Sequence, residues 1–530
     1  MKLTTIIFVA ISTILFSGCS PASISDTRPT TFGWKYTCGG GDCNEGTFLG
    51  GDKWIAPKNP GDEIRLISAT TSGADAGLEI NPTNPSQQGF LSCPYLSSSY
   101  SAALDFSSKL PMTVTPNSSI VKAAQKTKGC QPASSNCCID KYEVLTVLAT
   151  PPPNNGATAF RPGMAGTYKR IFQLADFDFS LLPSDTRVNA TGQRADFSAT
   201  EKRWFTPFAD VHVMAGEAGR SFVPTGVPDY GATMGAVYLN DLIRTMGTES
   251  LASKQRAVEG LIQRGIDVYA SYKAGIRWHS GAGQYAGRKP PVAFFAALLV
   301  NDPAIKAEVQ ATANNNGNDF QEDGQISINM ATGKLPVWGD SCTEDGYWSN
   351  IFYAQNFDGG SGVMIGSGDN SRTCGDPYGY IDGPGGLPGT FYMPCCSTGE
   401  YISYQLAQSL MPAYCSAAND PQLSIYTRRV LTAGVHTQPD ACAPPDTREP
   451  ATCAPYAAGH PHCLYYGVTW GPDPNNAGEC IHNNSGGNTG QTGRFTLRDG
   501  YIMPNISNES PMSTQMRQQN GVTILNGCNP

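Results

Sequence analysis

Charged side chains are scarce in this 530-residue sequence. Asp, Glu, Lys and Arg together make up 15% of the residues, and the formal net charge is -8. A protein that binds nucleic acid needs a basic face opposite the phosphates, so this balance argues against nucleic acid as a partner. Long apolar runs are also missing. After the first residues, no run approaches the roughly 20 apolar residues that span a bilayer as a helix.

Several common motifs are absent as well. The sequence has no Gly-x-Ser-x-Gly turn, which carries the nucleophile of many esterases, and no Gly-Lys-Ser/Thr loop, which binds nucleotide phosphates. No segment repeats at a fixed period, which disfavours a solenoid or a propeller. We therefore expect neither an esterase nor a nucleotide-dependent enzyme, and we predict no cofactor.

The first 18 residues have the three-part form of a signal peptide. Lys2 precedes an apolar run from Ile6 to Phe16, and the small residues Ser17 and Gly18 precede Cys19. The run is too short for a permanent membrane-spanning helix, so cleavage is the better interpretation. The sequence therefore predicts export from the cytoplasm.

Residues 15–19, Leu-Phe-Ser-Gly-Cys, resemble the lipobox of bacterial lipoproteins. The resemblance implies removal of residues 1–18, a lipid on Cys19, and a protein held at a membrane of the bacterial envelope, facing the periplasm or the exterior. Residues 19–30 are rich in Ser, Thr and Pro, which is typical of a flexible tether. An ordinary secretory signal with an incidental cysteine is the alternative.

The cysteine count is consistent with a lipid on Cys19. The sequence contains 17 cysteines, an odd number, and without Cys19 the other 16 can all pair. Cysteines in an exported chain are expected to form disulfides, because the compartment is oxidising. The sequence alone does not give their connectivity.

The mature chain divides into three parts, which together predict an α+β multidomain fold. Residues 31–230 have short apolar runs between Gly, Pro and Ser, which predicts a β-rich domain. Residues 231–435 have apolar residues at intervals of three and four, which predicts a helical domain. Residues 436–530 return to Gly and Cys and are expected to form a disulfide-linked closing segment. The helices are expected within 231–243, 258–272, 290–300, 398–414 and 421–435, with mostly loop between 312 and 394.

The segment between the second and third expected helices holds the residue types of an acid-base site. His279 titrates near neutral pH, Tyr285 can donate a proton, and Arg288 or Lys289 can neutralise a carboxylate. Trp278 precedes the histidine and is a candidate for substrate binding. The alternative is a structural turn, in which the glycines of 281–287 join two helices and the aromatic residues pack.

This segment also carries a resemblance. Residues 263–302, together with Tyr-Met-Pro-Cys-Cys at 392–396, Leu-Met at 410–411 and Tyr-Thr-Arg-Arg at 426–429, resemble a group of exported bacterial proteins of unknown function. That group is similar in style to the helical toroids of polysaccharide lyases, so the resemblance implies an incomplete α/α toroid for residues 231–435. In such lyases a Tyr or His removes the proton next to a uronic carboxylate while Asn, Arg or His offsets the developing charge. By residue type, the resemblance implies these roles for His279, Tyr285 and Arg288.

Two further groups of residues are candidates for a site. Asp210 and His212 would lie on one face of a strand, where the carboxylate could orient the imidazole as a general base. The alternative is a solvated pair at the end of a surface strand. Trp348 and Tyr353 lie in an acidic, aromatic segment that could bind sugars, and paired carboxylates there would permit glycoside hydrolysis.

Metal binding is not expected. Cys453, His460, His462 and Cys463 are zinc-ligand types, but their spacing is irregular and disulfides should claim the thiols. Residues 319–330 partly match a calcium loop, but Met330 stands where the bidentate glutamate belongs, so a polar turn is the preferred interpretation.

We predict an exported lipoprotein that acts on polysaccharide, as a lyase or a hydrolase, or binds it. The alternative is a non-catalytic glycan-binding or adhesion protein of the cell surface.

Overall fold

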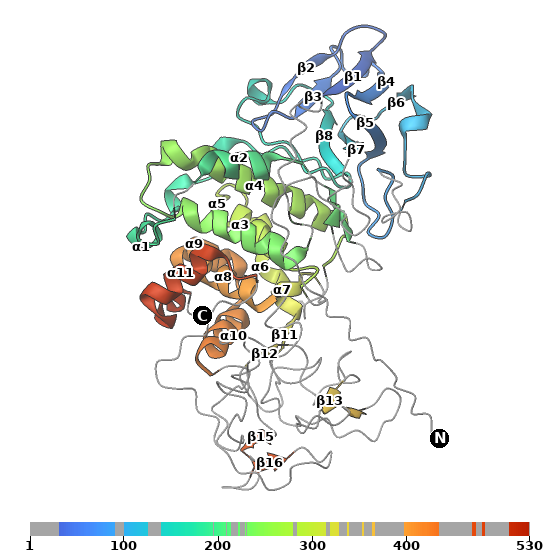
Figure 1. Ribbon diagram of the computed structural model, residues 1–530. Helices are drawn as coiled ribbons and strands as arrows, with labels where there is room; N and C mark the ends of the chain where they lie inside the picture. The colour runs from blue at the N-terminus through green and yellow to red at the C-terminus, as the bar shows by residue number, and fades with distance from the viewer. Residues whose placement is uncertain are drawn as a thin grey trace, which may run out of the picture.

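A computed structural model describes a large part of the chain. The described residues are 31–90, 100–125, 139–193, 196–207, 209–213, 221–222, 228, 230–278, 283–313, 319–327, 336–338, 352–354, 363–365, 397–433, 469–472, 480–482 and 508–528. Residues 209–213, 221–222, 337–338, 352–354, 363–365, 469–472 and 480–482 are described by their backbone alone. Figure 1 shows a strand-rich region followed along the chain by a helical region.

Two sheets form the strand-rich region. The smaller has the order β1 (Phe32–Cys38), β4 (Ile64–Thr71), β6 (Met112–Thr113), and the larger has the order β2 (Asn44–Thr47), β3 (Lys53–Ala56), β8 (Ile139–Val147), β7 (Ser118–Gln125), β5 (Ala74–Ile80). Neighbouring strands are antiparallel except β3 and β8, which run parallel. The predicted β-rich character of this part of the chain is confirmed.

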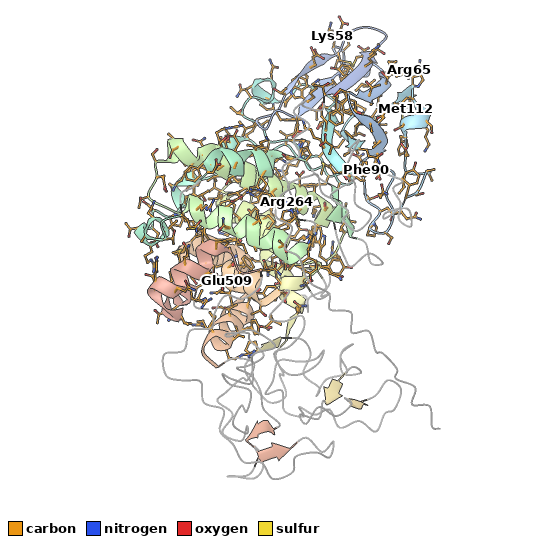
Figure 2. All side chains as sticks on the ribbon, in the orientation of Figure 1. Lys58, Arg65, Phe90, Met112, Arg264 and Glu509 are labelled. Atoms are coloured by element: carbon orange, nitrogen blue, oxygen red, sulfur yellow. A yellow bond between two sulfur atoms is a disulfide. The ribbon has the colours of Figure 1, made fainter. Side chains whose placement is uncertain are left out.

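The larger sheet is buried on both faces. Ile120 and Leu145 join the core between the two sheets, whereas Val121 and Val144 join the core of the helical region. Neighbouring side chains on a strand point to opposite faces, so β7 and β8 connect the two cores. Phe90 belongs to the helical core, and Figure 2 marks it where the two regions meet.

Eleven helices are described in the resolved ranges of the chain. They are α1 (Thr186–Ala190), α2 (Phe197–Phe205), α3 (Gly231–Thr245), α4 (Leu251–Lys273), α5 (Lys289–Leu298), α6 (Pro303–Thr312), α7 (Gln321–Gly324), α8 (Thr398–Leu410), α9 (Pro412–Ala418), α10 (Pro421–Ala433) and α11 (Pro511–Asn520). Short strand pairs join β9 (Ala209–Val213) to β10 (Ser221–Phe222), β11 (Ile326–Ser327) to β12 (Val337–Trp338), β13 (Phe352–Ala354) to β14 (Val363–Ile365), and β15 (Thr469–Pro472) to β16 (Cys480–His482). No described helix is both long and apolar enough to cross a bilayer.

The predicted helices are found, and the structure differs from the expectation in four ways. The expected helix at 258–272 begins earlier, at Leu251. The expected helix at 398–414 is two helices, because Pro412 lacks the amide proton that a continuous helix needs at that position. Helices α1 and α2 lie within 31–230, which was expected to be β-rich, and α2 packs along α4 of the helical region. The predicted loop at 312–394 contains α7 and the short strands β11 to β14.

Two disulfides are present among the described cysteines. Cys38 bonds Cys43 at a Cα–Cα distance of 5.1 Å, and Cys415 of α9 bonds Cys528 at 5.7 Å. The second bond fastens the end of the chain to the helical region. Hydrogen bonds support the same attachment, because the amide of Ser510 donates to Ser403 Oγ of α8 at 2.8 Å and the amide of Met512 donates to Asn240 Oδ1 of α3 at 3.2 Å. Figure 2 marks Glu509 among these helices.

The Cys415–Cys528 bond is expected to stabilise the fold more than the Cys38–Cys43 bond. The first closes a loop over a sequence separation of 113 residues and the second over 5. On loop entropy alone, a loop of roughly 100 residues corresponds to about 4.7 kcal/mol and one of a few residues to about 2 kcal/mol. Urea unfolding of the double variants Cys415→Ser/Cys528→Ser and Cys38→Ser/Cys43→Ser measures both losses. Equal losses would contradict the expectation.

One arginine joins the strand-rich and helical regions. Arg161 Nε donates to Asp52 Oδ2 at 2.7 Å, and its two terminal nitrogens donate to Asp267 at 2.9 and 2.6 Å. Asp52 precedes β3, and Asp267 lies in α4. All three side chains are buried, so the planar guanidinium forms a charged bridge inside the protein.

Replacement of this bridging arginine is expected to be severe. Arg161→Met would leave the carboxylates of Asp52 and Asp267 buried without their cation, which typically costs about 3–5 kcal/mol. The control is Arg187→Met, since Arg187 forms a largely exposed pair with Asp185, and such pairs contribute about 0–1 kcal/mol. Denaturant unfolding measures both, and a small loss for Arg161→Met would show that the bridge is not structural.

Candidate functional site

The predicted site segment is anchored on both sides of residues 279–282. Before it, the backbone amide of Trp278 donates to the carbonyl of Asp319 at 2.9 Å. After it, the amide of Gly283 donates to the hydroxyl of Tyr230 at 3.0 Å, and the amide of Tyr285 donates to Gln321 Oε1 at 3.0 Å. The ends of the segment that contains His279 are therefore fixed to α7 and to the start of α3.

Aromatic stacking supports the first anchor. Trp278 is fully buried and its ring lies parallel to that of Phe320, with centroids 5.4 Å apart. Phe320 stacks in turn on Tyr272, at 5.7 Å. Arg277 lies over the Tyr272 ring at 4.1 Å, and its Nε lies 2.6 Å from Asp319 Oδ1. Parallel rings and a buried ion pair leave this end of the segment little freedom.

Charged groups are buried where α5 begins. Glu322 Oε1 accepts hydrogen bonds from the backbone amides of Gly287, at 2.7 Å, and Arg288, at 3.1 Å. A carboxylate is favourable there because the free amides at a helix N-terminus carry partial positive charge. The guanidinium of Arg288 donates to the carbonyls of Gln284, at 3.1 Å, and Ala286, at 2.7 Å. Arg288 thus holds the backbone of the segment that leads into the helix.

The neighbouring lysine also has internal partners. Lys289 Nζ forms an ion pair with Asp323 and lies 3.7 Å from Asp420 Oδ2. Both Lys289 and Asp323 are fully buried. Burial raises the pKa of Asp323 to about 7, although the nearby Lys289 ammonium acts in the opposite direction. The pair therefore joins α5, α7 and the start of α10 beneath the candidate site.

Two glycines allow a glutamate of α8 to reach this cluster. A methyl group at Gly235 of α3 would lie 2.8 Å from the Gly287 Cα and 2.7 Å from the Glu400 Cγ. Gly287 also has φ of +81°, a conformation that other residues rarely adopt. Only glycine fits at either position, and the result is that Glu400 packs on Gly235, Gly235 packs on Gly287, and Gly287 donates to Glu322.

The Glu400 carboxyl is the least satisfied group of the cluster. Neither of its oxygens has a hydrogen-bond partner among the described residues, and the side chain is fully buried. Burial raises the pKa of Glu400 well above its usual range, and the carboxyl of Glu322 raises it further. The pKa of Glu322 is also raised, chiefly by burial. Burial and the neighbouring carboxyl therefore both favour the neutral acid form of Glu400.

The charges of the cluster lead to the same conclusion. Four carboxyl groups, those of Glu322, Asp323, Glu400 and Asp420, lie around the two cations Arg288 and Lys289. If all four were ionised, the buried cluster would carry two excess negative charges, which a low-dielectric interior strongly disfavours. This excess favours a neutral carboxyl within the cluster, and Glu400 is the best candidate because neither of its oxygens has a hydrogen-bond partner among the described residues.

The structure places four of the sequence-predicted site residues together. Trp278, Tyr285, Arg288 and Lys289 all lie on this segment, and Tyr285 is half-buried. Trp278 and Lys289 do not fit the predicted substrate contacts, because neither side chain reaches solvent. Arg288 is likewise buried, so it supports the segment and does not present its charge to a ligand.

The side chains of most other predicted residues are not described. His279, Trp348 and Cys19 lie outside the described residues, as do the cysteines and histidines of 453–463. Asp210 and His212 lie on β9 and Tyr353 on β13, where the backbone alone is described. Of the calcium-like segment, Asp319 pairs with Arg277 and Asp323 with Lys289. Within the described ranges no three His, Cys, Asp or Glu side chains are grouped to hold a metal ion.

Sequence reasoning missed Glu322 and Glu400. Glu322 lies in the segment that was interpreted as a polar turn, and its contact with Gly287 spans 35 residues. Glu400 did carry a signal, since it is the single charged residue of α8, whose sequence is TGEYISYQLAQSL. A lone charge in a helix that is buried almost all round is unusual and points to an internal role.

Comparisons with known proteins give no match. No family model, no curated protein and no solved structure is similar to this chain.

Replacing Glu400 by glutamine is expected to change how stability depends on pH. The pKa of Glu400 is higher in the folded protein than the value of about 4.3 expected in the unfolded chain. Above pH 4.3, the folded protein therefore binds more protons than the unfolded chain. The contribution of protonated Glu400 to the free energy of unfolding is therefore fully present below that pH and is lost as the pH rises. Glutamine mimics the neutral acid. The free energy of unfolding of Glu400→Gln, relative to wild type, should therefore increase by up to about 1.4 kcal/mol for each pH unit.

Urea unfolding across a series of pH values measures this difference. The control is Glu63→Gln, a change at an exposed glutamate of the strand-rich region. Parallel pH curves for wild type and Glu400→Gln would refute the assignment of a retained proton to Glu400.

Proposed function

We propose that this protein is an exported, lipid-anchored protein of the bacterial envelope that acts on or binds polysaccharide through residues 278–289. In this proposal Cys19 carries the lipid, and α3, α4, α5, α8 and α9 form part of an incomplete α/α toroid. The shared core of these helices supports that interpretation. The reaction we favour is β-elimination at a uronic acid.

The observation that carries the proposal is the buried Glu400 carboxyl, which has no hydrogen-bond partner among the described residues and packs on Gly235, next to Gly287. An unpartnered polar group in a protein interior typically costs roughly 1–3 kcal/mol, and it is retained mainly where it has a function. Groups with strongly shifted pKa values concentrate at functional sites. Here they lie under the segment that contains Tyr285 and adjoins His279, the two residues best suited to proton transfer.

In β-elimination, a base removes the proton next to the uronic carboxylate while the glycosidic oxygen leaves from the adjacent carbon and takes up a proton. A carbon–hydrogen and a carbon–oxygen bond break, and a carbon–carbon double bond forms. We assign the base to His279 and the acid to Tyr285. Burial raises the pKa of Tyr285, against the opposing effect of Arg288, so its hydroxyl keeps the proton it would donate. Arg288 acts as a positioning residue through the carbonyls of Gln284 and Ala286.

The test is an ultraviolet assay for unsaturated uronide products. Purified mature protein is incubated with a panel of acidic polysaccharides, and His279→Ala and Tyr285→Phe are compared with wild type. Each change should lower the rate by about 10²–10⁴-fold, the usual contribution of a general acid or base. The matched control is Tyr100→Phe, a partly buried tyrosine of the strand-rich region, which should leave the rate unchanged.

A folded wild-type protein that releases no unsaturated product from any polymer would reject the lyase assignment. Product that persists in both His279→Ala and Tyr285→Phe would reject the site instead.

A further inference from the structure

Three aromatic side chains form a row on β1. Phe32, Trp34 and Tyr36 are each half-buried, and the two residues between them are exposed. Side chains two positions apart on a strand point to the same face. Trp34 and Tyr36 rest on the core between the two sheets, while β1 is an edge strand of the smaller sheet. These three side chains, the aromatic row, therefore contact the core between the sheets and are partly exposed to solvent.

Side chains of the larger sheet fix the rings of the aromatic row. Trp34 Nε1 donates to Glu143 Oε1 of β8 at 2.6 Å, and the hydroxyl of Tyr36 donates to Glu45 of β2. Lys141 of β8 lies over the Phe32 ring, 5.9 Å from its centroid. Because the rings are already oriented, little conformational entropy would be lost when a ligand covers them.

These contacts combine flat apolar surfaces with hydrogen-bond acceptors. A pyranose ring has an apolar face of C–H groups, which packs on an aromatic ring, and a rim of hydroxyls, which donate to carboxylates. Glu143 and Glu45 place carboxylates beside the rings of Trp34 and Tyr36. A polyuronate would bring its own negative charges toward those carboxylates, and like charges across an interface are disfavoured.

From this arrangement we infer that the aromatic row is a second glycan-binding site, and that it takes a neutral polysaccharide. It is separate from the proposed lyase site, because the row belongs to β1 whereas Tyr285 and Glu400 belong to the helical region. The protein would thus hold a neutral glycan with one region while the other region acts on an acidic polymer. The two assignments can be tested separately.

Native affinity electrophoresis of the full mature protein tests the inference. Gels contain dissolved xylan, galactomannan or hydroxyethylcellulose, and alginate or pectate for comparison. At least one neutral polymer should slow the wild-type protein, and Trp34→Ala and Phe32→Ala should each weaken the affinity by about tenfold or more. The matched control is Phe106→Ala, because Phe106 also lies under a lysine, Lys109 at 4.0 Å, on the same region but outside the row.

Thermal unfolding monitored by circular dichroism checks that the variants fold. If Trp34→Ala does not fold, Phe32→Ala decides, because the Phe32 ring has no hydrogen bond to lose. The inference is overturned if no neutral polymer slows wild type, if only alginate or pectate does, or if Phe106→Ala weakens binding as much as Phe32→Ala. Retardation by a neutral polymer without uronide product would refute the lyase proposal and support the binding site.

Discussion

The guanidinium of Arg161 is the interaction on which the arrangement of the molecule depends. It is a permanent charge in the interior, and its two carboxylate partners belong to different regions, Asp52 to the strand-rich region and Asp267 to α4. A planar fork with fixed donor directions sets both the distance and the angle between its partners. Helix α4 also leads into Arg277 and Trp278. The helix that pairs with Arg161 therefore also positions the candidate site.

At the start of α5, close backbone packing makes room for a buried carboxyl group. Glycine at 235 and 287 removes the side chains that would keep α3 and α8 from the segment, and the space admits a carboxyl group with no hydrogen-bond partner among the described residues. A cluster of this kind is poor as a stabilising device, since apolar residues of similar volume usually serve as well or better. Its burial among these helices, at a cost to stability, is the physical reason to regard it as functional.

The sequence predicted the parts of this structure that depend on local periodicity. Helices α3 and α5 and the strand-rich region follow from apolar spacing, and Tyr285 and Arg288 were found because they adjoin an expected helix. The burial of Trp278 and Lys289 could not be predicted, because it depends on Phe320 and Asp323, more than 30 residues away. The approach of Glu400 to Gly235 joins residues further apart still, and no local pattern encodes such a pairing.

The bond between Cys415 and Cys528 closes a covalent ring that includes α10, the β15–β16 pair and α11. A protease that cuts this ring once would not release a fragment, since both new ends would stay joined through the sulfur atoms. For a protein proposed to work outside the cytoplasm, where proteases are common, the ring means that a single cleavage between α10 and α11 leaves the chain in one piece until the disulfide is reduced.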